Sequence, residues 1–514
     1  MADLPAEVWL RILELAAGDD QPLDYALPTS MTESSWFKML SGNWGLRTPH
    51  ESCYLRERER LAMLKAVAST CKSLRQYVSE FLYKSLFFTN AAHIQTLAFL
   101  FDQDRNLGKW ARRIHIVRYP VEDKVHMQDV LEPLLSIVRR SRKLQFFIAE
   151  CPVLGSFAPI ADALCCSCSR TLRTLHLNLS SDEMAKVIWT LDLLPALVSL
   201  HLDFAAPSGD IVLGSASGLA LTLPNLQQLS LRGFVAEFIE EATAWVFPSL
   251  RIVSFDFMHF HEDLPDILEF LTHQGRNLTF LDIYSIPPLD VASVLDLCPM
   301  LQTFAFNMDW RLPVDASVTN TTVAKLVHSP HMNITTIGCY ELLYAFGVGY
   351  AAAHANASPL AAQHVRHSND MNFAALNKQN FPNLSRIRVL DRTLLRDLEV
   401  ANGPHGSCFS RWERWWAQCA RQRIRLEDCT GAELGNLPED GEDDEFDDGE
   451  GEEEEGDVDD EEEIVEVIEE VFVQDPRDPL TVIRDLVEEC RAVSEELSGS
   501  VMDQFYDTRA FSHY

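Results

Sequence analysis

The chain has 514 residues, a hydrophobic content of 47% and a formal net charge of -34 at pH 7, and this length allows about two to four domains. Residues 439 to 470 hold 22 Asp and Glu and no Lys or Arg, so they account for most of the excess charge and leave -12 for the rest of the chain. So mild an acidity argues against nucleic acid as the main partner.

The sequence also lacks the usual signs of export, membrane insertion and bound cofactors. No apolar run approaches the roughly 20 residues that span a bilayer, and the start MADLPAEVW has no signal-peptide pattern. We therefore expect no membrane association and a cytoplasmic or nuclear location. The 12 cysteines form no CxxC pair, and Cys165, Cys166 and Cys168 with His176 nearby match no zinc spacing. We expect reduced thiols, no metal and no cofactor.

Three amphipathic segments predict a helical domain over residues 1–90, with helices at about 4–17, 56–74 and 75–84. Their motifs resemble the F-box family. The resemblance is carried by Leu4-Pro5-Ala6-Glu7-Val8, Ile12-Leu13, Val67, Cys71-Lys72-Ser73-Leu74-Arg75 and Leu82-Tyr83. Two tryptophans typical of the family are replaced by Leu74 and Tyr83.

The F-box resemblance implies that this domain docks on the Skp adaptor of a cullin-RING ubiquitin ligase. The adaptor-binding residues that it implies are Leu4, Pro5, Val8, Ile12, Leu13, Leu64, Val67, Cys71, Leu74, Leu82 and Tyr83. The alternative is that these helices form a cap that covers the first repeat of the domain that follows.

An insertion at about residues 19–60 separates the first two helices, where the F-box family has a short turn. Loop-closure entropy grows only with the logarithm of length, so the insertion costs about 2 kcal/mol. Its large apolar side chains are expected to fold back over the adaptor surface. They are Trp36, Phe37, Leu40 and Trp44.

Residues 91–140 are expected to form a connecting helical region or a first repeat, and residues 141–430 to form a repeat domain. A phrase of the type Leu-Pro-x-Leu-x-x-Leu-x-Leu returns along the second range, and its starts are 23 to 29 residues apart from residue 172 to residue 301. The strand positions that it predicts are Leu144/Phe147, Leu172/Leu175/Leu177, Leu197/Leu200/Leu202, Leu226/Leu229/Leu231, Leu250/Val253/Phe255, Leu278/Leu281/Ile283, Leu301/Phe304/Phe306, Ile334/Ile337 and Leu384/Ile387/Val389.

Between these strands the apolar period changes to that of a helix, so each unit is a strand followed by a helix. One unit buries too few side chains to fold alone, whereas stacked units share a core. We expect an α/β solenoid with a parallel inner sheet. The pattern resembles the leucine-rich repeat family, without the usual asparagine or cysteine after the last leucine. An ordinary α/β domain is the alternative.

Side chains alternate along a strand, so residues beside the last apolar position point to the inner face of the sheet. We expect this row to contact an unknown protein substrate, with ordinary solvent-exposed surface as the alternative for each residue. The row consists of His176, Asn178, His201, Asp203, Ser230, Arg232, Ser254, Asp256, Asp282, Tyr284 and Asn307.

The C-terminal third departs from the repeat. Residues 340–380 break the period and are expected to form an enlarged repeat with a surface loop. Trp412, Trp415 and Trp416 lie at helical spacing, and the strand-like Ile424 and Leu426 follow, so this part is expected to cap the solenoid.

The end of the chain is acidic. Residues 437–463 are too charged to bury a core and are expected to be a disordered linker. Residues 464–514 are expected to form a helical tail. At its start Val465, Val467 and Ile468 resemble a SUMO-interacting motif, with an amphipathic helix as the alternative.

An F-box followed by leucine-rich repeats resembles a common, fungal-type architecture of the F-box family. It implies a non-catalytic subunit that binds the Skp adaptor and cullin complex through its first domain and a protein substrate through its repeats. The alternatives are a leucine-rich-repeat scaffold with a degenerate F-box, and an acidic-tailed binder of basic proteins.

Overall fold

The computed structural model describes residues 5–16, 25–39, 43–104, 106–117, 127–152, 157–257, 267–284, 290–309 and 326–438. Leu4, the SUMO-like Val465, Val467 and Ile468, the helical tail 464–514 and nearly all of the acidic range 437–463 lie outside them. The described residues form two compact units. The first holds residues 5–16 and 58–82, and the second holds residues 25–57 and 83–438.

Three helices supply the first unit: α1 (Ala6–Ala16), most of α2 (Pro49–Thr70) and nearly all of α3 (Lys72–Lys84). Their buried core consists of Leu13, Leu64, Ala68, Val78 and Phe81. Each helix contributes at least one of these side chains, so the three helices are held together by one small core.

Helix α2 begins at Pro49, before the expected start at residue 56. The Thr48 hydroxyl accepts a hydrogen bond from the Glu51 N–H at 2.9 Å, and the Glu51 carboxylate accepts one from the Thr48 N–H at 2.6 Å. This reciprocal pair is a capping box, with proline at the first helical position. The expected insertion 19–60 is therefore too long at its C-terminal end, and Thr48-Pro49-His50-Glu51 was the signal that the periodicity analysis missed.

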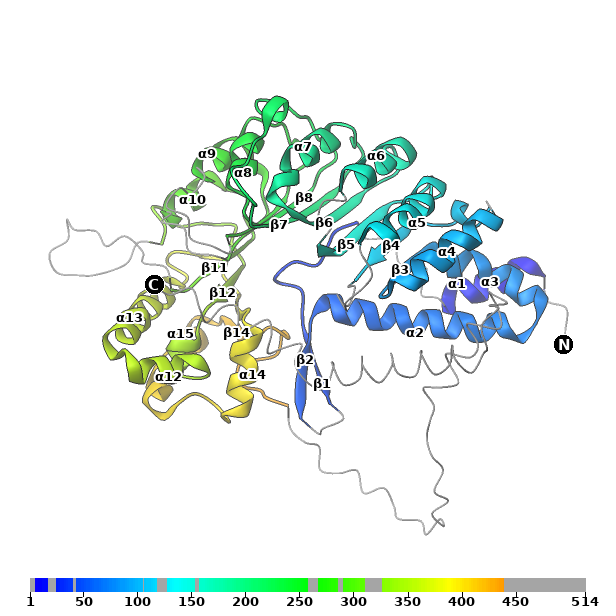
Figure 1. Cartoon of the computed structure of the whole chain (residues 1–514). Coiled ribbons are helices and arrows are strands. Elements are labelled where there is room, and N and C mark those ends of the chain that lie inside the picture. The colour runs from blue at the N-terminus through cyan, green and yellow to red at the C-terminus, as the bar shows by residue number, and fades with distance from the viewer. Residues whose placement is uncertain are drawn as a thin grey trace, which may run out of the picture. The chain divides into compact units, whose positions relative to one another are not determined.

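The second unit is built on a parallel sheet whose twelve described strands follow one another in chain order, from β3 to β14 (Figure 1). The strands are β3 (Ser85–Phe88), β4 (Arg113–Ile116), β5 (Phe146–Pro152), β6 (Thr174–Ser180), β7 (Ser199–Ala205), β8 (Gln228–Gly233), β9 (Ile252–Asp256), β10 (Phe280–Ile283), β11 (Thr303–Asn307), β12 (Thr336–Tyr340), β13 (Arg386–Val389) and β14 (Arg425–Glu427). The α/β class and parallel sheet are confirmed, and the arrangement is compatible with a repeat solenoid.

One apolar row runs through all twelve strands in register, and every member is buried. The row consists of Leu86, Ile114, Phe147, Leu175, Leu200, Leu229, Val253, Leu281, Phe304, Ile337, Ile387 and Leu426. In every predicted copy of the repeat, the middle apolar position is the member of this row. Strands β3 and β4 lack the Leu-Pro phrase and were not predicted. The sheet therefore starts at Ser85, before the boundary expected at residue 90.

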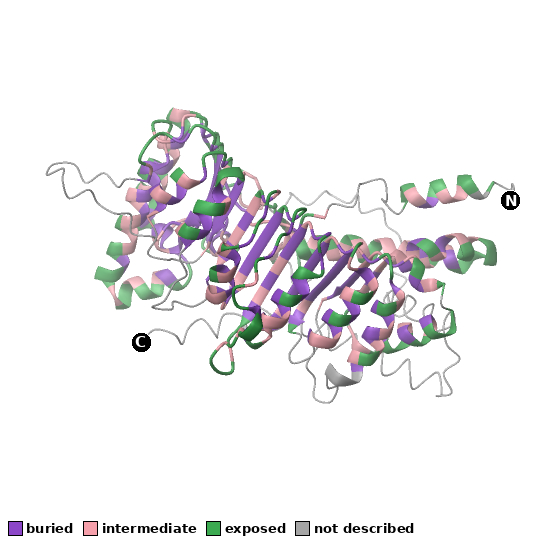
Figure 2. Cartoon of the chain, turned by 90° about the horizontal axis from the view of Figure 1, so that it is seen from above, coloured by how far each residue is buried: buried purple, intermediate pink, exposed green. Residues whose placement is uncertain are grey.

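Helices connect the strands, and Figure 2 shows the strands as a mainly buried band beside helices with exposed sides. These helices are α4 (Ala91–Gln103), α5 (Met127–Arg140), α6 (Phe157–Cys168), α7 (Met184–Asp192), α8 (Ala236–Thr243), α9 (Ile267–Gln274), α10 (Val291–Leu297), α11 (Leu343–Phe346), α12 (Tyr350–Ala357), α13 (Pro359–Ala375), α14 (Arg392–Val400) and α15 (Phe409–Gln422). No helix within the described ranges has the length and apolar character needed to cross a membrane.

The surface loop expected within residues 340–380 is wrong, because α11, α12 and α13 occupy that stretch. Of these helices, α11 and α13 contact α15, the expected tryptophan helix. The Trp415 ring stacks on the Phe373 ring with centroids 4.0 Å apart and planes 3° apart. Strand β14 follows α15 and forms the C-terminal edge of the sheet.

Substitution of Gly233, at the end of β8, tests how closely the neighbouring strands are packed. Its φ is +84°, and a Cβ at this position would overlap the Phe204 carbonyl oxygen. Gly233→Ala should therefore lower the free energy of unfolding by at least about 2 kcal/mol, measured by denaturant unfolding. Gly209→Ala is the matched control, since open space surrounds Gly209. Equal losses in the two variants would contradict this packing.

Candidate partner-binding surfaces

The inner face of the sheet carries a second row of side chains in register, which we call the inner row. Its members from β6 to β13 are His176, His201, Ser230, Ser254, Asp282, Ala305, Gly338 and Arg388. The structure thus brings together the first predicted substrate residue of each strand from β6 to β10, while Ala305, Gly338 and Arg388 were not predicted. Asn178, Asp203, Arg232 and Asp256 form a parallel row two residues further along.

None of the eleven predicted substrate residues is exposed. His176, Ser230, Asp282 and Asn307 are buried, and the other seven are half-buried. Some pair with one another: the Arg232 guanidinium lies 3.1 Å from the Asp256 carboxylate and 3.8 Å from that of Asp203. The alternative of ordinary solvent-exposed surface is therefore wrong for this row.

Residues 25–34, which we call the inner segment, cover much of this face. In Figure 1 the deep blue trace that leads to β1 runs beside the inner side of the sheet. The Tyr25 ring stacks on Phe146 of β5 at 5.3 Å between centroids. Leu27 bonds to Gln228 of β8, and Ser34 donates its N–H to the carbonyl of Cys429, 2.9 Å away. The segment thus crosses the sheet from β5 to the residues that follow β14.

The large apolar side chains of the insertion belong to the second unit where the structure describes them. Trp36 and Phe37 lie in β1 (Ser35–Lys38) and Trp44 in β2 (Trp44–Arg47), which pair as an antiparallel hairpin within the second unit. Leu40 lies outside the described residues. Within the insertion, residues 25–34 cover the inner face of the sheet.

Two buried charged groups beneath the inner segment, Arg388 and Asp282, have hydrogen-bond partners. The Arg388 side chain is 5% exposed, and its Nε and Nη2 donate to the Glu427 carboxylate at 3.0 and 2.8 Å. The Tyr340 hydroxyl lies 2.9 and 3.0 Å from the two oxygens of Asp282, whose pKa is raised to about 7 by burial. On this face the charge of Arg388 is therefore balanced by that of Glu427, and the raised pKa of Asp282 reduces its negative charge.

A histidine cluster lies nearer the N-terminal end of the sheet. The rings of His176 and His201 are 4.1 Å apart, and those of His50 and His176 are 6.5 Å apart. Glu150 lies 2.8 Å from His115 Nε2 and 3.9 Å from His50 Nδ1. Burial lowers the pKa of His201 to about 3 and that of His176 well below its usual value. These two rings are neutral at physiological pH.

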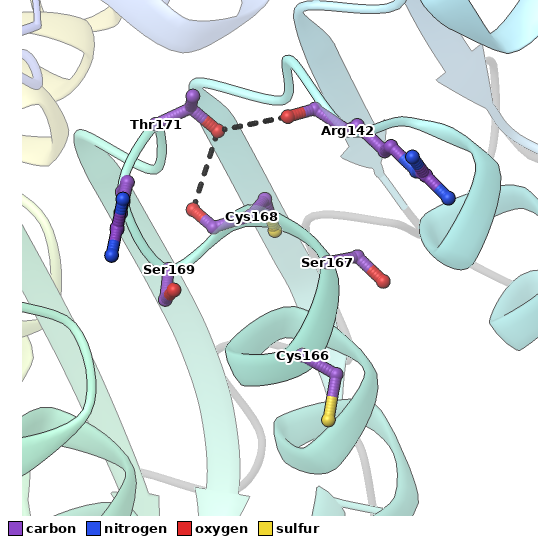
Figure 3. A pocket seen from close by; sticks show the side chains of 7 residues that line it. Arg142, Cys166, Ser167, Cys168, Ser169 and Thr171 are labelled. Carbon is purple, nitrogen blue, oxygen red and sulfur yellow. Dashed lines mark hydrogen bonds between the residues drawn. The ribbon is translucent and has the colours of Figure 1, made fainter.

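The described part of the chain holds no group of three or more His, Cys, Asp or Glu side chains placed to hold a metal ion. The cysteines near residue 166 border a shallow hollow of about 330 Å³ at the C-terminal end of α6 (Figure 3). The Thr171 hydroxyl there lies 3.3 Å from the carbonyl oxygens of Arg142 and Cys168. Burial raises the pKa of the Cys168 thiol to about 12, so it stays protonated.

The predicted adaptor residues fall into three groups by exposure. Leu13, Leu64 and Tyr83 are buried, and Val67, Leu74 and Leu82 are half-buried. Tyr83 belongs to the second unit and stacks on Trp110 with centroids 6.4 Å apart. Exposed members are Pro5, Val8, Ile12 and Cys71.

Helix α1 presents an exposed apolar stripe. Val8, Ile12 and Leu15 are 40%, 42% and 57% exposed, while Leu13 on the same helix is 2% exposed. Spacings of four and three residues place the three exposed side chains on one side of the helix. Leu15 was not among the predicted residues, although its spacing from Ile12 was the available signal.

Comparison with known proteins adds little. No protein-family model matches the chain, and no curated protein matches it. Among solved structures it is similar to a crystal structure of a Bacteroides fragilis protein, with 11% identity, coverage of 79% of this chain and 95% of that chain, and a TM-score of 0.32. A likeness this weak carries no argument about function.

His201, half-buried and held neutral, should make the fold sensitive to acid. An unfolded histidine has a pKa of about 6.5 and His201 in the fold about 3, so between these values the unfolded chain binds a proton that the fold does not. Stability from this residue is thus lost as the pH falls below 6.5. Between pH 7.5 and 5, His201→Gln should lose about 1–2 kcal/mol less free energy of unfolding than the wild type.

Urea unfolding at the two pH values measures this difference. His273→Gln, at an exposed position on α9, is the control and should follow the wild type. An equal loss of the free energy of unfolding in His201→Gln and in the wild type would contradict the neutral state of His201 in the fold.

Proposed function

We propose that this protein is the substrate-recognition subunit of an SCF-type (Skp-cullin-F-box) E3 ubiquitin ligase. In this proposal α1, α2 and α3 bind the Skp adaptor, and the second unit holds the protein to be ubiquitinated. The chain itself is non-catalytic: it raises the rate of transfer by holding substrate near the conjugating enzyme.

The exposed stripe on α1 is the observation that carries the proposal. Leu13 and its neighbour Leu10 face the core of the three helices, so the helix is already anchored on one side. Val8, Ile12 and Leu15 remain exposed on another. Three adjoining apolar side chains without cover are typical of an interaction site, and two of them are positions that the F-box resemblance assigns to the adaptor.

The burial of Tyr83, Leu13 and Leu64 limits which of the predicted residues can contact the adaptor. Tyr83 packs with Phe101 and Trp110 in the second unit, while Leu13 and Leu64 build the core of the first. The adaptor surface in this proposal is therefore narrower than the sequence suggested. It centres on Val8, Ile12 and Leu15, with Pro5 and Cys71 also accessible.

Replacing the stripe should abolish adaptor binding without disturbing the core. In the full-length chain, Val8→Ser, Ile12→Ser and Leu15→Ser together should weaken binding of a purified Skp adaptor at least tenfold, because each apolar contact contributes about 1 kcal/mol. Binding is measured by biolayer interferometry. The control variant carries Leu193→Ser, Val212→Ser and Val246→Ser, three exposed apolar positions of the second unit, and should bind like the wild type.

Failure of the wild-type chain to bind any Skp adaptor would overturn the proposal in favour of a leucine-rich-repeat scaffold with a degenerate F-box. Equal binding by wild type and stripe variant would move the adaptor surface away from α1. Retained adaptor binding after removal of residues 439–470 would argue against the acidic-tailed binder.

A further inference from the structure

The inner segment is held by its main chain. The Gln228 side chain is 2% exposed, accepts the Leu27 N–H at 2.7 Å and donates to the Leu27 carbonyl at 3.1 Å. One side-chain amide thus pairs with both backbone groups of a residue, as a neighbouring strand would. Ser199 donates to the same Gln228 oxygen at 2.8 Å and fixes the amide. These bonds require only that residue 27 is not proline, while the buried position of Leu27, 8% exposed, favours an apolar side chain there.

Other bonds along the segment follow the same pattern. The Thr174 hydroxyl donates to the Tyr25 carbonyl at 2.7 Å, and Arg388 Nη1 donates to the Met31 carbonyl at 2.8 Å. Residues 25–34 form neither helix nor strand of their own. The segment makes one turn, where the Thr32 N–H donates to the Thr29 carbonyl at 3.0 Å. Apart from that turn it runs across the inner face as an irregular chain held by side chains that bond to its backbone, which is how peptides in extended form are bound.

Two side-chain positions add selectivity. Met31 packs against a cluster of Ala305, Tyr340 and Leu390. Gly338 forms the floor of this slot, since a Cβ there would lie 3.1 Å from the Met31 sulfur. Two residues on, the Glu33 carboxylate accepts from Arg388 Nη2 at 3.0 Å while its side chain stays 60% exposed.

The groove keeps its charges paired without the segment. Arg388 retains both bonds to Glu427, Asp282 retains those from Tyr340, and Gln228 retains that from Ser199. Buried charges that lose a partner are strongly destabilising, and departure of residues 25–34 leaves none of these in that state. The inner face is therefore suited to exchange one extended chain for another.

We propose that the inner face from β5 to β13 is a peptide-binding groove, occupied in this structure by the chain's own residues 25–34. Its partner is an extended protein segment with an unbranched apolar side chain for the Gly338 slot and a carboxylate two residues later for Arg388. That segment displaces residues 25–34. The inference rests on the proposed function only in taking the second unit as the substrate-binding part.

Residues 25–34 belong to the same chain as the face that they cover, and this connection lowers the apparent affinity for an added peptide. A segment joined to its own groove competes at a high effective concentration, so a peptide added in solution binds weakly to the wild type. Loosening the segment should reveal the intrinsic affinity of the groove. Leu27→Pro removes the N–H that Gln228 accepts, and Met31→Asp places a charge in the apolar slot.

The probe is a fluorescent peptide with the sequence of residues 25–34, YALPTSMTES. By fluorescence anisotropy, the full-length chain with Leu27→Pro and Met31→Asp should bind it at least tenfold more tightly than the wild type. Two matched peptides, with Met31→Asp or Glu33→Lys, should bind this loosened chain at least tenfold more weakly. No binding to a loosened chain with wild-type circular dichroism, or equal binding of all three peptides, would overturn the proposal.

A measurement on the wild-type chain covers the case in which the loosened chain does not fold. Saturating unlabelled probe peptide should speed hydrogen exchange at the Leu27 and Ser34 amides of the chain, while amides of the Leu229 row stay protected. Unchanged exchange at Leu27 and Ser34 would make residues 25–34 a permanent part of the fold and overturn the inference. Neither experiment involves the adaptor, so its outcome is independent of the adaptor-binding test.

Discussion

A parallel sheet needs cover on both faces, and this requirement organises the second unit. The apolar row through Leu175 and Leu229 faces the connecting helices and is buried along all twelve described strands. The opposite face carries polar groups such as Gln228, Asp282 and Arg388, which are costly to bury without partners. Cover on that side comes from residues 25–34, which meet these groups with carbonyls and N–H groups as well as with apolar side chains.

The sequence predicted the sheet well because the relevant signal is local. Two apolar side chains that are two residues apart follow a helix that ends at a proline, and this pattern recurs along the repeats. Stacking of the repeats aligns the equivalent residues, such as Leu200, Leu229 and Val253. Strands β3 and β4 lack the phrase and were missed. The start of α2 was missed because a capping box, and not apolar periodicity, marks it.

The contact of residues 25–34 with the inner face of the sheet could not be predicted from the period of the apolar residues. Gln228 and Leu27 are 201 residues apart, and their contact uses the backbone of Leu27. Main-chain recognition leaves no pattern in the side chains of the recognised segment. In the first domain the motif also does not tell core residues from surface residues. It contains Leu13, which is part of the core, and Ile12, which is exposed, and only their burial in the structure separates the two.

The link between Arg388 and Met31 also has a consequence for synthesis. These residues are 357 positions apart, and a ribosome that adds about 5–20 residues per second needs roughly 20–70 s to make the intervening chain. Residues 25–34 therefore leave the ribosome long before β13 exists. Until then the segment has no complete groove to occupy, and the nascent repeats expose an uncovered inner face. The inner face becomes fully covered only when the last repeats, with Arg388, have emerged and folded.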